Sequence, residues 1–111
     1  MPYIRITTNV NDLPVGAIEK KLGEAIALIP GKTERWLMTC VEGGAKMAFA
    51  GSEEPCLMAE VSLFGAASES AYANLTAELC RTLSELTGVR ADRIYVKYEE
   101  IGTWGWSGSN F

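Results

Sequence analysis

A proline directly follows the initiator methionine, and it is the residue of this chain best suited to act as a base. Methionine is readily removed before compact residues, so we expect Pro2 to become a free N-terminus. Residues 3–8 are β-branched and apolar enough to form a strand, which would hold that amine rigidly. An α-amino group titrates at about 7.7–8.0, and burial or a nearby cation lowers its pKa further. Pro2 is therefore a candidate general base, although a proline can also begin a strand without any catalytic role.

The sequence contains no histidine, which removes the commonest general base and metal ligand. An enzyme built on this chain would need a carboxylate, a lysine or the N-terminus as its base. Three cysteines are present without a close pair, at Cys40, Cys56 and Cys80. This spacing favours buried free thiols over a disulfide framework.

Length and charge narrow the class of protein. The chain has 111 residues, enough for one domain with a modest core. Its formal net charge of −4 argues against a general nucleic-acid binder. No apolar run reaches the ~20 residues that a membrane span requires, and the start lacks the pattern of a signal peptide. We therefore expect a cytoplasmic protein with no membrane partner.

The first half of the chain has the pattern of a strand, a helix and a second strand. A helix is predicted to begin at 11–14, with a capping side chain and an early proline, and to end at 30–31. Its apolar face recurs at helical spacing: Ile18, Leu22, Ile26 and Ile29. A largely buried strand is predicted over 35–41 and a short strand over 46–50.

The second half repeats this plan. A strand over 57–64 precedes a helix that ends at Gly88, and a returning strand is predicted over 92–99. The helix's apolar face comprises Tyr72, Leu75, Leu79, Leu83 and Leu86. The chain is thus predicted to be a single α+β domain, residues 1–111, with a pseudo-repeat of 1–50 and 56–101 and a C-terminal interface segment, 102–111.

Two β-α-β units give one four-stranded sheet with both helices on one face. Alternating strand positions look apolar nearly throughout, as in strands that are buried on both faces. No third layer exists in the sequence. We therefore expect other copies of the chain to cover the second face in a closed symmetric oligomer.

Several motifs together resemble one known family. They are Met1-Pro2, Thr8-Asn9-Val10, Gly31-Lys32, residues 47–56, Asp92-Arg93-Ile94-Tyr95-Val96 and the closing residues 105–111. In this order they resemble the macrophage migration inhibitory factor and D-dopachrome tautomerase branch of the tautomerase superfamily. The resemblance covers essentially the whole chain.

The resemblance implies a homotrimer with active sites between subunits. It assigns the catalytic base to Pro2 and the contact with the substrate's acidic end to Lys32. Phe64 would contribute a backbone amide, and Tyr95 would come from the neighbouring subunit. The hydrophobic wall would consist of Trp104, Trp106 and Phe111.

The implied reaction is keto–enol tautomerisation of an α-keto acid such as phenylpyruvate, or of dopachrome, without a cofactor. Lys32 would stabilise developing negative charge and lower the pKa of Pro2. Each residue also has a structural alternative. Lys32 follows a helix end, where a lysine can offset the helix dipole. Tyr95 and the tryptophans can be packing residues.

Two positions depart from the family's pattern. Lys97 stands where an asparagine is frequent near the pocket mouth, which predicts a shift toward acidic substrates. Ala59 replaces the second cysteine of a C-x-x-C pair that begins at Cys56, so thiol oxidoreductase activity is not expected.

Two other functions remain open at this stage. One is a different superfamily reaction, such as hydration, decarboxylation or dehalogenation. The other is a cytokine-like protein that binds a receptor and is secreted without a signal peptide.

Overall fold

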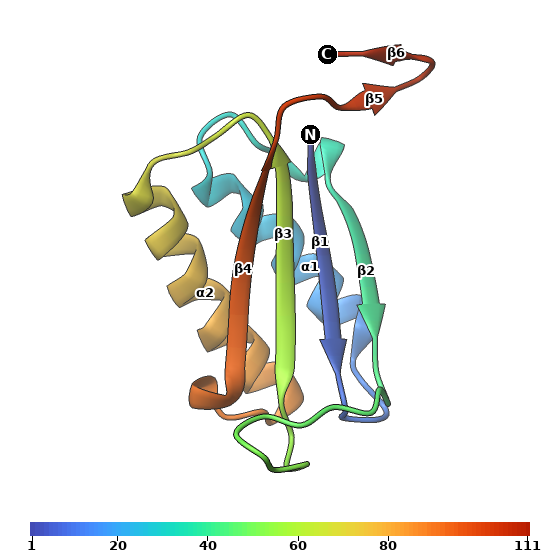
Figure 1. Cartoon of the computed structure of the whole chain (residues 1–111), viewed down its shortest axis with the longest axis vertical. Coiled ribbons are helices and arrows are strands. Elements are labelled where there is room, and N and C mark those ends of the chain that lie inside the picture. Colours follow the sequence, from blue (N-terminus) through green and yellow to red (C-terminus); the bar gives the residue numbers. More distant parts are fainter.

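The computed structural model describes all residues, 1–111, and shows a four-stranded mixed sheet with two helices packed on one face (Figure 1). The strands are β1 (Pro2–Thr8), β2 (Met38–Glu42), β3 (Leu57–Phe64) and β4 (Ile94–Ile101). The helices are α1 (Val15–Ala25) and α2 (Glu69–Thr87). A small hairpin of β5 (Gly105–Trp106) and β6 (Ser109–Asn110) ends the chain. The predicted α+β fold is confirmed.

The sheet has the order β2-β1-β3-β4 and is assembled from two β-α-β units, each of which runs from the centre of the sheet to one edge. Within each unit the strands are parallel, as in the pairs Tyr3–Met38 and Leu57–Ile94. The two units join through the antiparallel pair β1–β3, in which Pro2 lies opposite Leu63. Pro2 therefore begins a central strand, at the one strand position where a missing N–H costs no ladder bond.

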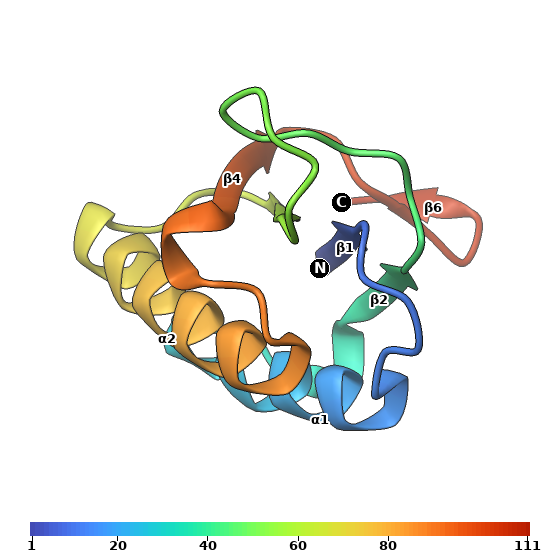
Figure 2. The ribbon, with the colours of Figure 1, turned by 90° about the horizontal axis from the view of Figure 1, so that it is seen from below.

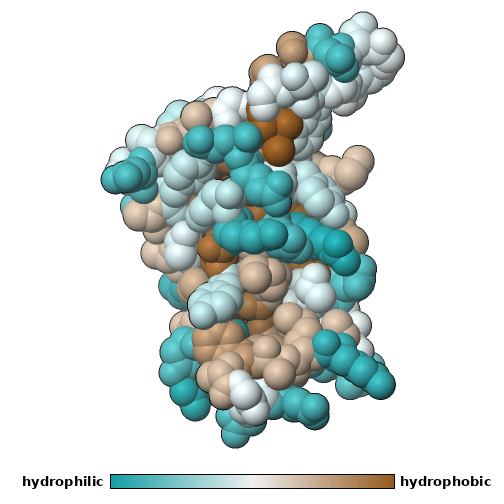
Figure 3. Space-filling model, viewed as in Figure 1, coloured by the Kyte–Doolittle hydropathy of each residue, from teal (hydrophilic) through white to brown (hydrophobic).

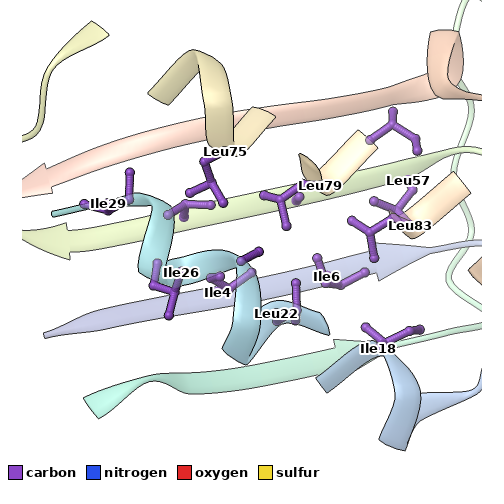
Figure 4. Close-up of a cluster of buried hydrophobic side chains, with 14 of the residues drawn as sticks. Ile4, Ile6, Ile18, Leu22, Ile26, Ile29, Leu57, Leu75, Leu79 and Leu83 are labelled. Carbon is purple, nitrogen blue, oxygen red and sulfur yellow. The ribbon is translucent and has the colours of Figure 1, made fainter. Parts of the chain in front are cut away.

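The core lies between the sheet and the helices (Figures 2 and 4). Alternate residues of β1 and β3 point toward the helices and are fully buried, for example Ile4, Ile6 and Leu63. They meet the predicted apolar faces of α1 and α2, including Leu22 and Leu79. Burial of these side chains is the main force that fixes β1, and with it the N-terminus.

The two helices begin differently. At α2 the Ser68 side chain accepts a hydrogen bond from the Ala71 N–H at 3.1 Å, and the left-handed Gly88 closes the other end. At α1 the residue before the helix is Pro14, and no side chain caps it. The predicted capping side chain at 11–14 is therefore wrong, whereas the predicted early proline is present as Pro14, whose ring sets the entry of the chain.

Two predicted strands begin later in the structure, and a third predicted strand does not form. Residues Glu34–Trp36 and Ala91–Arg93 form single 3-10 turns, so β2 and β4 begin later than predicted. β2 is only half-buried because it is an edge strand. The expected strand over 46–50 is an irregular loop with one isolated bridge, Phe49 to Ser52.

Arg93 holds this loop in place. It is 8% exposed and donates hydrogen bonds to four loop carbonyls, at distances between 2.8 and 3.2 Å. The acceptors are Phe49, Ser52, Glu54 and Pro55. Asn9 supports the same loop by donating to the carbonyls of Glu53 and Glu54 and accepting from the Cys56 N–H. Backbone groups that a strand ladder would satisfy are thus satisfied by side chains.

The sheet face opposite the helices carries paired charges, so the expected nearly continuous apolar pattern on this face is wrong. A hydrophilic band crosses the middle of this face (Figure 3). Lys97 pairs there with Glu60 at 3.3 Å and with Glu99 at 3.8 Å, while Arg5 pairs with Glu42 at 3.2 Å. A band of paired charges can remain in water or face a hydrated space between copies of the chain.

The three cysteines differ in burial. Cys56 is buried, whereas Cys40 and Cys80 are only half-buried, and all three are free thiols. Neither helix combines the length and the apolar character that crossing a membrane requires.

Candidate active site

The N-terminus lies at one end of the sheet, beside the C-terminal hairpin (Figure 1). Pro2 is buried at the start of β1, between β2 and β3. Its position is fixed by the ladder that continues from Pro2 into Ile4 and Ile6, two of the most deeply buried residues. The sequence therefore places a rigid N-terminal segment where the C-terminal hairpin can cover it.

Lys32 and Phe64 converge on the same point from two other elements. Lys32 follows the end of the α1 helical segment, and its Nζ donates to the Phe64 carbonyl oxygen at 2.9 Å. The Phe64 N–H, at the end of β3, donates to the Met1 carbonyl oxygen at 3.0 Å. An ammonium group and a backbone N–H thus both lie beside the first peptide unit of the chain.

The electrostatics of this point favour a neutral amine. Burial lowers the pKa of the Met1 amino group from its ordinary value, and the charge of Lys32 lowers it further. Both effects disfavour a second positive charge here. After removal of Met1, the amine of Pro2 would lie one residue away under the same two influences.

The C-terminal segment supplies an aromatic wall. The Phe111 N–H donates to the Trp104 carbonyl oxygen at 2.9 Å, which closes the hairpin. The Trp106 and Phe111 rings stack with their centroids 6.4 Å apart, and the centroids of the Phe111 and Phe64 rings are 5.7 Å apart. The structure therefore brings the three predicted wall residues to the side of the N-terminus.

Two cavities flank the N-terminal residues. The larger, about 710 Å³, is lined by Met1, Pro2, Trp36, Trp104 and Trp106 together with residues of β2 and β3. The smaller, about 460 Å³, is lined by Met1, Gly31, Phe64, Trp106 and Phe111. Cavities of this size, with mostly apolar walls and few polar groups, are typical of small-molecule sites.

Trp36 and Arg35 belong to this site although the sequence pattern did not single them out. Trp36 meets Trp106 edge to face at 5.1 Å, and the Arg35 guanidinium lies 5.3 Å from the Trp36 ring centroid. Both residues were assigned to a buried strand. The 3-10 turn Glu34–Trp36 instead presents them to the cavity. Their closeness to Lys32 in the chain was the one available signal.

Tyr95 and Lys97 lie on β4, away from the end of the sheet at which Pro2 lies. Tyr95 is opposite Met58 in the ladder, whereas the Pro2 end of the sheet is level with Glu100. Five residues of strand separate these levels, or about 17 Å at the usual rise. Tyr95 packs on Phe49 with centroids 4.8 Å apart, and Lys97 is paired with Glu60. A role for either residue at Pro2 therefore requires a second copy of the chain.

The arrangement can bind an anion and remove a proton. Lys32 and the Phe64 N–H would hold negatively charged oxygens, and the aromatic wall would hold an apolar group. A neutral N-terminal amine between them would act as the base. No group of three or more Asp, Glu or Cys side chains is arranged to hold a metal ion.

Known proteins match this chain in sequence over all or most of its length. The family model described as macrophage migration inhibitory factor matches residues 1–111. The mouse macrophage migration inhibitory factor is 28% identical over 115 residues, covering 100% of this chain and 99% of the mouse protein. A chicken D-dopachrome decarboxylase is 33% identical over 108 residues, covering 94% of this chain and 90% of the relative.

Solved structures agree with these matches. The crystal structure of Leishmania major MIF2 superposes with a TM-score of 0.92 at 26% identity, covering 100% of this chain and 97% of that one. A homologue from Prochlorococcus marinus gives a TM-score of 0.83 at 31% identity, with 98% of each chain covered. Sequence and fold therefore agree along the whole length, and the chain belongs to the macrophage migration inhibitory factor family.

Proposed function

We propose that the protein is a keto–enol tautomerase of α-keto acids such as phenylpyruvate, with the Pro2 nitrogen as general base. One observation carries the proposal. The start of β1 lies between two aromatic-lined cavities, with the Lys32 ammonium and the Phe64 N–H beside it. The proposal requires removal of Met1, because the Pro2 nitrogen is otherwise an amide without basicity.

The steps follow from these positions. The Pro2 nitrogen takes a proton from the carbon next to the keto group, and the C–H electron pair forms the enol double bond. Negative charge moves to the keto oxygen, where hydrogen-bond donors stabilise it until the proton held by the Pro2 nitrogen is returned to that oxygen, which regenerates the base. The Phe64 N–H, which binds the Met1 carbonyl in the full chain, would bind a substrate oxygen once Met1 is gone.

Lys32 would act twice in this reaction. Its charge binds the substrate carboxylate, and the same charge, which lowers the pKa of the Met1 amino group, would keep the Pro2 amine neutral once Met1 is removed. The aromatic wall of Trp36, Trp104, Trp106 and Phe111 would hold the phenyl ring of phenylpyruvate.

We further propose that the active form is a homotrimer whose sites lie between subunits. Within one chain, Tyr95 and Lys97 lie at a different level of the sheet from Pro2. A neighbour in a closed ring can bring its Tyr95 to the Pro2 of the first copy. Tyr95 is 59% exposed in the single chain, so its ring is available for such a contact.

The experiment combines an intact mass with a rate. Purified protein whose mass shows loss of Met1 should catalyse phenylpyruvate tautomerisation, and Pro2→Gly should lose most of that rate. Turnover that persists in Pro2→Gly would reject Pro2 as the base. Absence of turnover in the Met1-free wild type would reject the tautomerase and leave receptor binding, which the same Pro2→Gly protein can test separately.

A decarboxylase is the second candidate, because a relative at 33% identity is named D-dopachrome decarboxylase. The same base and anion site would then act on a substrate that releases carbon dioxide. Product analysis with D-dopachrome distinguishes the two, since only decarboxylation shortens the substrate by one carbon.

A further inference from the structure

Arg35 is a charged group on the wall of the Pro2 cavity. Among the side chains that line this space of about 710 Å³, it is the only one with a full charge. Its guanidinium lies 5.3 Å from the centre of the Trp36 ring, whose own partner is Trp106. Stacking on an aromatic ring leaves the edge of a guanidinium free to donate hydrogen bonds.

Arg35 has no carboxylate partner within the chain. The ion pairs of the molecule use Arg5, Lys21, Arg81, Arg90 and Lys97 as their cations. The adjacent Glu34 turns toward α1, where its carboxyl carbon would lie 2.6 Å from a Cβ placed on Gly23. Glu34 therefore packs over Gly23 and forms no ion pair with Arg35.

This isolation separates Arg35 from Lys97, the other cation expected to influence substrate choice. Lys97 lies within 4 Å of two carboxylates, Glu60 and Glu99, which already offset its charge. Arg35 adds uncompensated positive charge to a cavity whose lining contains no acidic side chain. Such a wall attracts an anion and rejects a cation.

Lys32 and Arg35 are three residues apart in the chain but lie beside different cavities. The Lys32 Nζ is bound to the Phe64 carbonyl, next to the smaller cavity, whereas Arg35 lines the larger one. Met1 and Trp36 line both cavities and so lie between the two cations. A substrate that crosses the N-terminus can therefore meet one cation at each end.

We propose that Arg35 binds a second carboxylate of the substrate, so that the preferred substrates are α-keto acids with a further carboxylate remote from the keto carbon. This inference rests on the proposed tautomerase site. The planar fork of arginine suits a bidentate carboxylate contact, which a lysine reproduces poorly. The contact forms in the ground state and the transition state alike, so it acts on substrate affinity more than on kcat.

The test compares phenylpyruvate with 4-carboxyphenylpyruvate, which differs by one remote carboxylate. Calorimetric Kd values and tautomerisation rates are measured for Met1-free wild type, Arg35→Gln and Arg35→Lys. Arg35→Gln should weaken binding of the carboxylated substrate about tenfold more than it weakens binding of phenylpyruvate. Arg35→Lys should recover only part of the loss. Arg81→Gln on α2 controls for the change in net charge.

Each result decides the question. Equal weakening of both substrates would overturn the inference, because Arg35 would then act only by holding Trp36. Unchanged binding of both would overturn it as well. Turnover of phenylpyruvate without any advantage for the carboxylated substrate would reject the inference and keep the tautomerase. Selective binding without turnover of either substrate would reject the tautomerase and keep Arg35 as an anion contact.

Discussion

At the scale of single residues, the proposed site depends on the charge of Lys32 beside the N-terminal amine. Lys32 is held by the Phe64 carbonyl and by the end of the preceding helix, so its ammonium cannot move far from the N-terminus. Burial and the positive charge of Lys32 both lower the pKa of the Met1 amino group. In the proposed mechanism, binding of an acidic substrate and activation of the base thus share one lysine.

Replacing Lys32 by methionine tests this double role. A neutral side chain leaves the burial effect but removes the charge effect, so the pKa of the Pro2 amine should rise. Because the reaction needs the unprotonated amine, the acid limb of the kcat/KM profile should move to higher pH. The value of kcat/KM should also fall by roughly 100-fold.

A matched control separates this effect from a general change in charge. Lys21→Met removes an exposed lysine on α1 that pairs only with Glu24, and its pH profile should equal that of the wild type. An acid limb that does not move in Lys32→Met would contradict the electrostatic role of Lys32.

Arg93 is a second residue whose effect can be tested alone. Arg93→Met leaves four loop carbonyls without their donor, and the free energy of unfolding should fall by about 2–4 kcal/mol. Urea denaturation measures this loss. Arg90→Met changes a nearby arginine with an exposed side chain and should have little effect; a similar loss in both variants would show that the loop contacts are unimportant.

At the scale of elements, the long apolar patterns predicted the structure best. Strands β1 and β3 and both helix faces could be predicted because their periodicity comes directly from burial against one core. The 3-10 turn Glu34–Trp36 could not, because its composition resembles a strand and tertiary contact with the hairpin decides its shape. The family resemblance alone predicted a site role for Lys32, and neither that resemblance nor any apolar pattern pointed to Arg35.

Substitution by alanine should have different effects at two glycines, Gly88 and Gly16. A Cβ added at either position meets no atom within 4 Å, but Gly88, which closes α2, has a φ of +77°, whereas Gly16 lies within α1. Gly88→Ala should therefore destabilise the protein by about 1–2 kcal/mol, because a Cβ is strained in the left-handed region. Gly16→Ala should be neutral or stabilise by about 0.5 kcal/mol.

Thermal unfolding of these two variants provides the comparison. The same substitution at two glycines should shift Tm in opposite directions, or leave it unchanged at Gly16. Equal losses at both positions would mean that the end of α2 does not depend on the left-handed glycine.

At the scale of the whole molecule, the chain has one covered sheet face and one face crossed by charges. The sequence predicted that the open face is covered by other copies, but it did so from an apolar pattern that the structure does not show. The paired charges of this face and the position of Tyr95 instead fit a ring of copies that contact one another around a water-filled space. Sites shared between subunits of the proposed trimer lead to a direct test.

Mixed trimers provide that test. Pro2→Gly and Tyr95→Ala chains, each impaired alone, are unfolded together and refolded as an equal mixture. If each site combines Pro2 of one subunit with Tyr95 of the next, about a quarter of the sites regain both residues in random trimers. Phenylpyruvate turnover should rise accordingly. No recovery in mixtures shown by native mass spectrometry to be mixed would contradict a shared site.

The central claim is that the free nitrogen of Pro2 is the base. The most direct measurement is the phenylpyruvate tautomerase rate of a variant with one alanine inserted before Pro2, with the N-terminus of each sample verified by intact mass. The insertion keeps Pro2, Lys32 and the aromatic wall but converts the Pro2 nitrogen into an amide. The rate should fall to the uncatalysed level. A rate equal to that of the Met1-free wild type would contradict the account.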